Sequence, residues 1–70
     1  MKTKKEVLTS YLETAEETLL KINIRMEYVN KRHGEEQKQS FLRDLAELTA
    51  DKKETENWVE FLKEEISKEK

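Results

Sequence analysis

His33, the chain's one histidine, lies in the segment KRHGEEQ, residues 31–37, close to the carboxylates of Glu35 and Glu36. A histidine beside two carboxylates is a possible start of a metal site. The spacing matches no established metal motif, and the chain has no cysteine and no second histidine to complete a ligand set. We therefore predict no bound metal, and we interpret His33 as a solvated residue whose charge suits a helix C-terminus.

The sequence gives little support for other kinds of catalytic site. Carboxylates are frequent, but general acid and base work requires two of them in different, partly buried environments, and these lie on a polar helix face. The serines Ser10 and Ser67 lie far along the chain from His33, and Gly34 is the only glycine, so no glycine-rich phosphate loop exists. We predict no catalytic residues, no cofactor and no enzymatic activity.

Composition indicates a small helical protein. The chain has 70 residues, which is one domain at most, and it lacks cysteine and proline. Charged residues make up 43% of it, a value typical of helical hairpins and coiled coils but also close to that of disordered chains, so the apolar pattern must decide. No apolar run reaches the roughly 18 residues of a membrane span, and we expect a cytoplasmic protein with no membrane partner.

The apolar residues recur at spacings of three and four. In the first half this heptad seam comprises Leu8, Leu12, Ala15, Leu19, Ile22, Met26 and Val29. In the second half the same rhythm covers Phe41, Leu45, Leu48, Lys52, Thr55, Val59, Leu62 and Ile66, of which the fourth and fifth are polar. This pattern predicts two long helices that pack through one seam each.

The helix ends follow from local signals. Thr3 and Glu6 fit a capping box, and Gly34 suits the residue after a helix because it reaches positive φ without a steric clash. We therefore predict an all-α hairpin over residues 1–70, with helix 1 at about 4–33, a turn at 33–35 and helix 2 at about 36–68. The short turn makes the helices antiparallel neighbours.

That turn would place opposite one another residues whose numbers sum to about 70. Val29 would then meet Phe41, and Leu8 would meet Leu62. Leu19 and Ala15 would face Lys52 and Thr55 in a thin, polar waist, where a lysine can extend its ammonium to water. One alternative is a break in helix 2 near Thr49–Asp51, because Asp51 and Glu54 also fit a capping box.

A single seam leaves ten further apolar residues without a place in the hairpin. Among them Leu20, Ile24 and Tyr28 recur every four residues on the side of helix 1 away from the seam, and Tyr11 is expected beside Trp58. The predicted interaction face comprises Tyr11, Leu20, Ile24, Tyr28, Trp58 and Phe61. Exposed apolar faces mark partners, and symmetric dimers are the commonest oligomers, so we expect a homodimer that forms a four-helix bundle.

Two other functions remain open. An adaptor or inhibitor would bind a different protein through the same apolar residues, and the acidic second half would direct it to a basic target. Nucleic-acid binding is the least favoured: Lys21, Arg25, Lys31 and Arg32 form a basic strip around Tyr28, but Glu27 interrupts it and the net charge of the chain is −2. No motif resembles that of a particular family.

Overall fold

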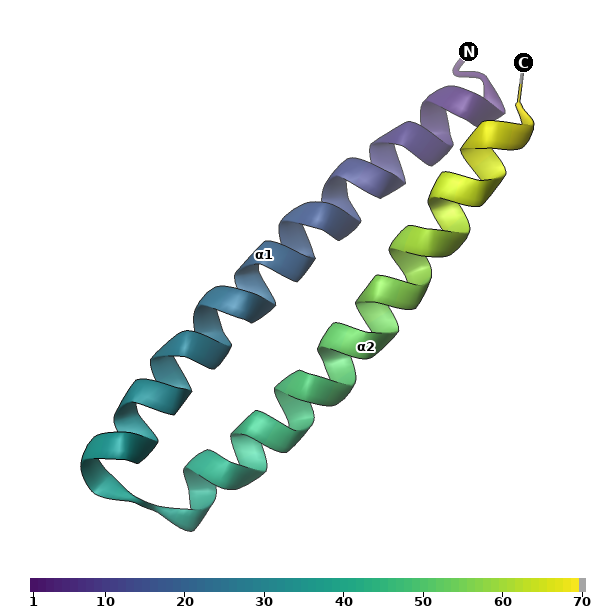
Figure 1. The fold of residues 1–70 in the computed structure, drawn as a ribbon. Helices are drawn as coiled ribbons and strands as arrows, with labels where there is room; N and C mark the ends of the chain where they lie inside the picture. The colour runs from purple at the N-terminus through teal and green to yellow at the C-terminus, as the bar shows by residue number, and fades with distance from the viewer. Residues whose placement is uncertain (70) are drawn as a thin grey trace.

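Two long α-helices form the whole described structure, a computed structural model that covers residues 1–69. Helix α1 spans Lys4–Glu36 and helix α2 spans Gln39–Lys68. They run antiparallel, with the N-terminus beside the end of α2 and the turn at the far end of a rod 51 Å long (Figure 1). The predicted all-α, two-helix architecture is confirmed, and Lys70, the last residue of the predicted hairpin, lies outside the described residues.

The start of α1 is capped as predicted. The Glu6 backbone N–H donates to Thr3 Oγ1 at 3.2 Å, and Thr3 has the extended conformation typical of an N-cap. Val7 N–H bonds to the Thr3 carbonyl at 3.1 Å, which closes the first turn. The sequence signal therefore fixes this boundary at the predicted residue.

The turn, by contrast, lies beyond the predicted residues 33–35. Helix α1 continues through Gly34, which has no positive φ, and ends at Glu36. Gln37 takes the left-handed conformation instead, with φ 52° and ψ 43°, and its N–H donates to the His33 carbonyl at 2.7 Å. A salt bridge of 2.7 Å between Arg32 and Glu36 spans Gly34 and adds an i,i+4 contact to the last turn of the helix.

The later turn moves the alignment of the helices by about one helical turn relative to the predicted one, although the predicted partners Leu8 and Leu62 still share the core cluster. With Gln37 and Lys38 as the connection, residues whose numbers sum to about 74 or 75 lie at the same level. The main core cluster agrees, because it joins Leu8, Ala15, Val59 and Leu62 with the half-buried Leu12 and Ile66. The physical reason is Ile66: at a sum of 70 it would lie level with Lys4, whereas here it covers the apolar cluster.

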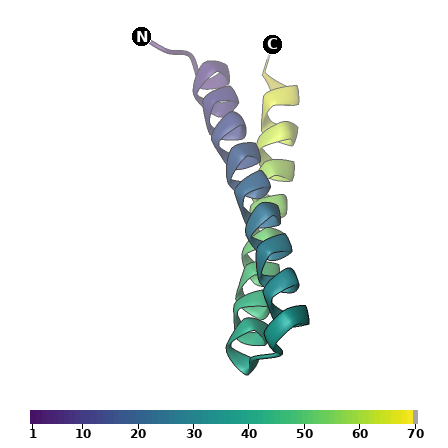
Figure 2. The ribbon, with the colours of Figure 1, turned by 90° about the vertical axis from the view of Figure 1, so that its left-hand side faces the viewer.

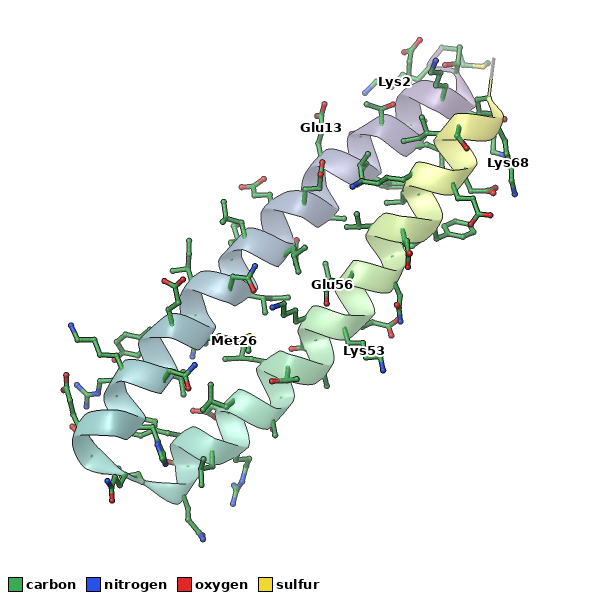
Figure 3. The ribbon with its side chains drawn as sticks, viewed as in Figure 1. Lys2, Glu13, Met26, Lys53, Glu56 and Lys68 are labelled. Atoms are coloured by element: carbon green, nitrogen blue, oxygen red, sulfur yellow. The ribbon has the colours of Figure 1, made fainter. Side chains whose placement is uncertain are left out.

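The seam itself is confirmed along both helices. The five buried apolar residues all occupy seam positions: Leu8, Ala15, Val29, Val59 and Leu62. The rest of the seam is half-buried, and Met26 lies between the two helices in Figure 3, whereas Glu13 projects away from α2. The helices cross at a shallow angle, as Figure 2 shows, which is the geometry that a seven-residue repeat imposes.

The core is concentrated toward the chain ends and thins in the middle of the rod. Lys52 and Thr55 are half-buried there, level with Ile22 and Leu19, so the polar waist exists. Ala15 does not belong to it as predicted, since it packs in the cluster with Val59. The waist leaves the hairpin with few fully buried contacts near its centre.

Helix α2 is continuous, so the alternative with a break near Thr49–Asp51 is wrong. Thr49 Oγ1 donates to the Leu45 carbonyl at 2.7 Å, a bond made within a helix rather than at a cap. No Gly or Pro interrupts this segment, so the helix continues through it in spite of the local capping signal at Asp51.

Candidate interaction surface

An aromatic cluster joins the two helices on the surface. The ring centroids of Tyr11 on α1 and Trp58 on α2 lie 6.2 Å apart with a tilt of 49°, and those of Trp58 and Phe61 lie 5.7 Å apart and stack at 11°. We call these three residues the aromatic cluster. Each remains 44–54% exposed despite these contacts, so the cluster is a surface feature rather than part of the core.

A second apolar group follows α1 alone. Leu20, Ile24 and Tyr28, here called the outer stripe, are 60%, 58% and 57% exposed. Their spacing of four residues places them on successive turns, on the side of α1 turned away from the seam. Ile24 and Tyr28 line a shallow hollow together with Lys21 and Arg25. The hollow is therefore lined by two apolar and two positively charged side chains.

The predicted interaction face thus divides into two parts. The structure brings Tyr11, Trp58 and Phe61 together, as the sequence predicts for the first two. It does not place the outer stripe in contact with them. Four more apolar side chains are exposed beside the two groups and Met1: Val7 at 37% and Leu42 at 52% are the larger of them, while Ala46 and Ala50 are small. The hairpin covers none of its off-seam apolar residues fully.

The carboxylate of Glu36 forms ion pairs with neighbouring side chains at the turn. Glu36 accepts from Arg32 at 2.7 Å and lies 3.2 Å from Lys38 Nζ. The hydrogen bond from Lys38, together with the charge of Arg32, lowers the pKa of Glu36 below its ordinary value of 4.5. The Arg32 guanidinium also lies 5.9 Å from the Phe41 ring centroid, a cation–π contact between the helices. This arrangement fixes the turn and leaves His33 half-buried beside it.

At the other end of the rod, Glu65 and Lys68 form a similar pair. Lys68 Nζ lies 2.9 Å from Glu65 Oε2, and this bond lowers the pKa of Glu65 and raises that of Lys68. The charge of Lys4 on α1 lowers the pKa of Glu65 by a smaller amount. Within residues 1–69, no three His, Asp or Glu side chains gather closely enough to hold a metal ion.

Comparison with known proteins gives no guide to function. No protein-family model, no curated protein and no solved structure matches the chain. Neither helix, over the part that the structure describes, has the length and apolar character needed to cross a membrane. Function must therefore be inferred from the surface of the hairpin alone.

Proposed function

We propose that this protein is a small, non-enzymatic helical interaction protein that self-associates into a four-helix bundle through its exposed apolar side chains. The observation that carries the proposal is the exposure, at 44–60%, of six large apolar residues in two ordered groups. Isolated surface apolar residues are normal, but ordered groups of this size mark interfaces. Both groups lie on rigid helices, which need no rearrangement to bind.

The dimensions of the hairpin suit this role. Its Cα atoms extend over 51 by 16 Å, so one broad face is large enough in outline for a protein interface of standard size, to which each partner contributes about 800 Å². A chain of this length gains only about 3–5 kcal/mol from its own core, and association is a common source of further stability. Two copies packed face to face would cover apolar surface that one hairpin leaves in water.

Sedimentation velocity and equilibrium at micromolar concentration test the proposal. We expect a dimer of 8.4 kDa chains whose dissociation on dilution lowers the thermal midpoint of unfolding. A strictly monomeric and fully helical species over the accessible concentration range would contradict self-association.

A second candidate function has one observation in its favour. The hollow is lined by the apolar Ile24 and Tyr28 and by the basic Lys21 and Arg25, a combination that suits a helix or peptide with acidic flanks from another protein. Affinity capture with the wild type and with Ile24→Glu tests this adaptor or inhibitor role. An identical set of captured proteins from both would count against the outer stripe as a binding site.

A further inference from the structure

The charges on one broad face of the hairpin are separated by helix. The aromatic contact between Tyr11 and Trp58 identifies this face, because both residues precede a seam position and lie on the same side of the rod. Residues at alternating spacings of three and four from each continue the face along the two helices. We call the two sets the α1 row, positions 4, 7, 11, 14, 18, 21, 25, 28 and 32, and the α2 row, positions 44, 47, 51, 54, 58, 61, 65 and 68.

The two rows carry opposite charge. Every charged residue of the α1 row is a cation: Lys4, Lys21, Arg25 and Arg32. The α2 row carries the acids Asp44, Glu47, Asp51, Glu54 and Glu65, with Lys68 as its one cation. The apolar residues of the face are Val7, Tyr11, Tyr28, Trp58 and Phe61. The face therefore combines an apolar surface with a basic edge and an acidic edge.

These opposite charges do not pair within the hairpin. The salt bridges of residues 1–69 all join residues within four positions of each other: Lys21–Glu17, Arg32–Glu36, Lys38–Glu36 and Lys68–Glu65. None connects the α1 row to the α2 row. The central charges of the face, such as Arg25 and Asp51, thus retain the capacity to pair with another molecule that has the complementary pattern.

We infer that this face binds the same face of a second copy, with the two hairpins parallel and their turns at the same end. The inference rests on the proposed self-association and adds its interface and orientation. A symmetric face-to-face dimer has two arrangements. A two-fold axis along the rod places α1 on the partner's α2, which brings cations to acids. An axis across the rod places α1 on α1 and α2 on α2, which brings like charges together and is unfavourable.

The levels of the residues agree with the first arrangement. In parallel hairpins, side chains at equal distance from the turn oppose each other, and those distances match where residue numbers sum to about 75. Lys21 is then level with Glu54 of the other copy, and Arg25 is nearly level with its Asp51. The aromatic cluster lies at the same level in both copies, toward the end of the rod that holds the chain termini, and supplies apolar surface there. The outer stripe residues Leu20 and Ile24 lie outside this face.

Two charge-reversed proteins test the interface. One carries Lys21→Glu with Arg25→Glu, which makes the middle of its α1 row acidic; the other carries Asp51→Lys with Glu54→Lys, which makes the middle of its α2 row basic. Each alone should dimerise on the order of tenfold or more weakly than the wild type, and an equimolar mixture should recover a heterodimer of near wild-type affinity. The matched control Glu56→Lys with Glu60→Lys makes the same charge change off the face, and it should form wild-type homodimers.

Orientation is read from spin labels, which the absence of cysteine makes simple. A label on Lys38→Cys at the turn should give an intermolecular distance on the order of 20–30 Å, because neighbouring helices of a bundle lie about 8–10 Å apart. An opposed dimer would instead separate the labels by nearly the 51 Å length of the rod. Helical content by circular dichroism is measured for every variant, so that loss of folding is separated from loss of pairing.

The outcomes separate the two proposals. Short label distances together with recovery on mixing support the parallel interface. A stable dimer with distant labels, or with charge variants that never recover on mixing, overturns the inference and leaves self-association standing. A wild-type chain that is monomeric throughout overturns both.

Discussion

Tyr11 and Trp58 lie with their ring centroids 6.2 Å apart, one on each helix, and connect α1 to α2 outside the seam. Trp58 also stacks on Phe61, which extends the contact along the surface of α2. The hairpin is thus held by its seam and by one aromatic contact beside it. The same rings that support the hairpin remain available to a partner, so fold stability and binding share residues.

Removal of the Trp58 ring should weaken both the fold of the hairpin and its binding to a partner. Trp58→Ala loses two ring contacts, each worth about 0.5–1.5 kcal/mol, so we expect the free energy of unfolding to fall by about 1–3 kcal/mol. Urea unfolding followed by circular dichroism gives the value. Leu42→Ala removes an apolar side chain of similar exposure that lies outside the aromatic cluster, and its effect should be much smaller. Equal losses in the two variants would show that the aromatic contacts contribute nothing beyond burial.

The seam should be most sensitive at Leu62, the one large side chain with no exposed surface among the described residues. Leu62→Ala should lower the free energy of unfolding by about 2–5 kcal/mol, because the cavity is enclosed by the core cluster. That loss approaches the whole stability of so small a chain. Leu20→Ala makes the same chemical change at 60% exposure and should remain within about 0.5 kcal/mol of the wild type. Thermal and urea unfolding at one fixed concentration compares them.

The sequence was sufficient for the seam, because burial in a two-helix rod depends only on the three-and-four spacing. It predicted the contact of Tyr11 with Trp58 as well, although it placed the turn a few residues too early. Long aromatic side chains tolerate that error. It could not show which of the off-seam apolar residues gather, since this depends on how the helices are rotated against each other.

The turn was predicted too early in the chain because the local signal at Gly34 was given more weight than the alignment of the apolar residues of the two helices. Gly34 is the residue best able to end a helix, yet Gln37 ends it. A signal that indicates the correct position lies at the seam ends: matching Leu8 with Ile66, the first and last apolar seam residues, gives a sum of 74 and a turn near residue 37. The Arg32–Glu36 spacing also favours a helix that continues past Gly34.

The position of the turn predicts that two opposite substitutions, one that removes a glycine and one that introduces a glycine, both stabilise the fold. Gly34 lies inside α1 with open space where a Cβ would project, so Gly34→Ala should raise the free energy of unfolding by about 0.5–1 kcal/mol. Gln37 holds a positive φ that a glycine adopts freely, so Gln37→Gly should raise it by up to about 1 kcal/mol. Urea unfolding midpoints measure both. A destabilising Gly34→Ala would instead place the turn at residue 34.

Acid should weaken the ends of the rod. The pKa of Glu36 is lowered, first by the hydrogen bond from Lys38 and then by Arg32, and that of Glu65 is lowered by Lys68. These native pKa values lie below 4.5. The contribution of the two carboxylates to the free energy of unfolding is therefore fully present above pH 4.5 and is lost as the pH falls through their native pKa values. Lys68 shows the converse: its pKa is raised, so its contribution is present below pH 10.5 and lost above the raised value.

Carboxyl titration by NMR checks the two acids directly, with Glu35, which has no ion pair to Lys38, as the internal comparison. Glu36→Gln should reduce the dependence of the unfolding free energy on pH between 7 and 3. An unchanged dependence in that variant would show that the pair at the turn does not stabilise the fold.

The polar waist should lower the stability of the hairpin while it restricts the register of the two helices. Lys52 is a half-buried seam residue level with Ile22, so Lys52→Leu places apolar surface against apolar surface and should raise the free energy of unfolding by about 1 kcal/mol. A single polar seam residue also restricts register and oligomeric state. With leucine there, a pairing shifted by one turn, at a sum of 70, becomes less unfavourable. We therefore expect a higher urea midpoint together with doubled amide resonances or larger assemblies by sedimentation. Lys53→Leu alters the exposed neighbour, and it should show neither the higher urea midpoint nor the doubled resonances. A Lys52→Leu protein with a single set of amide resonances would show that the polar waist has no role in register.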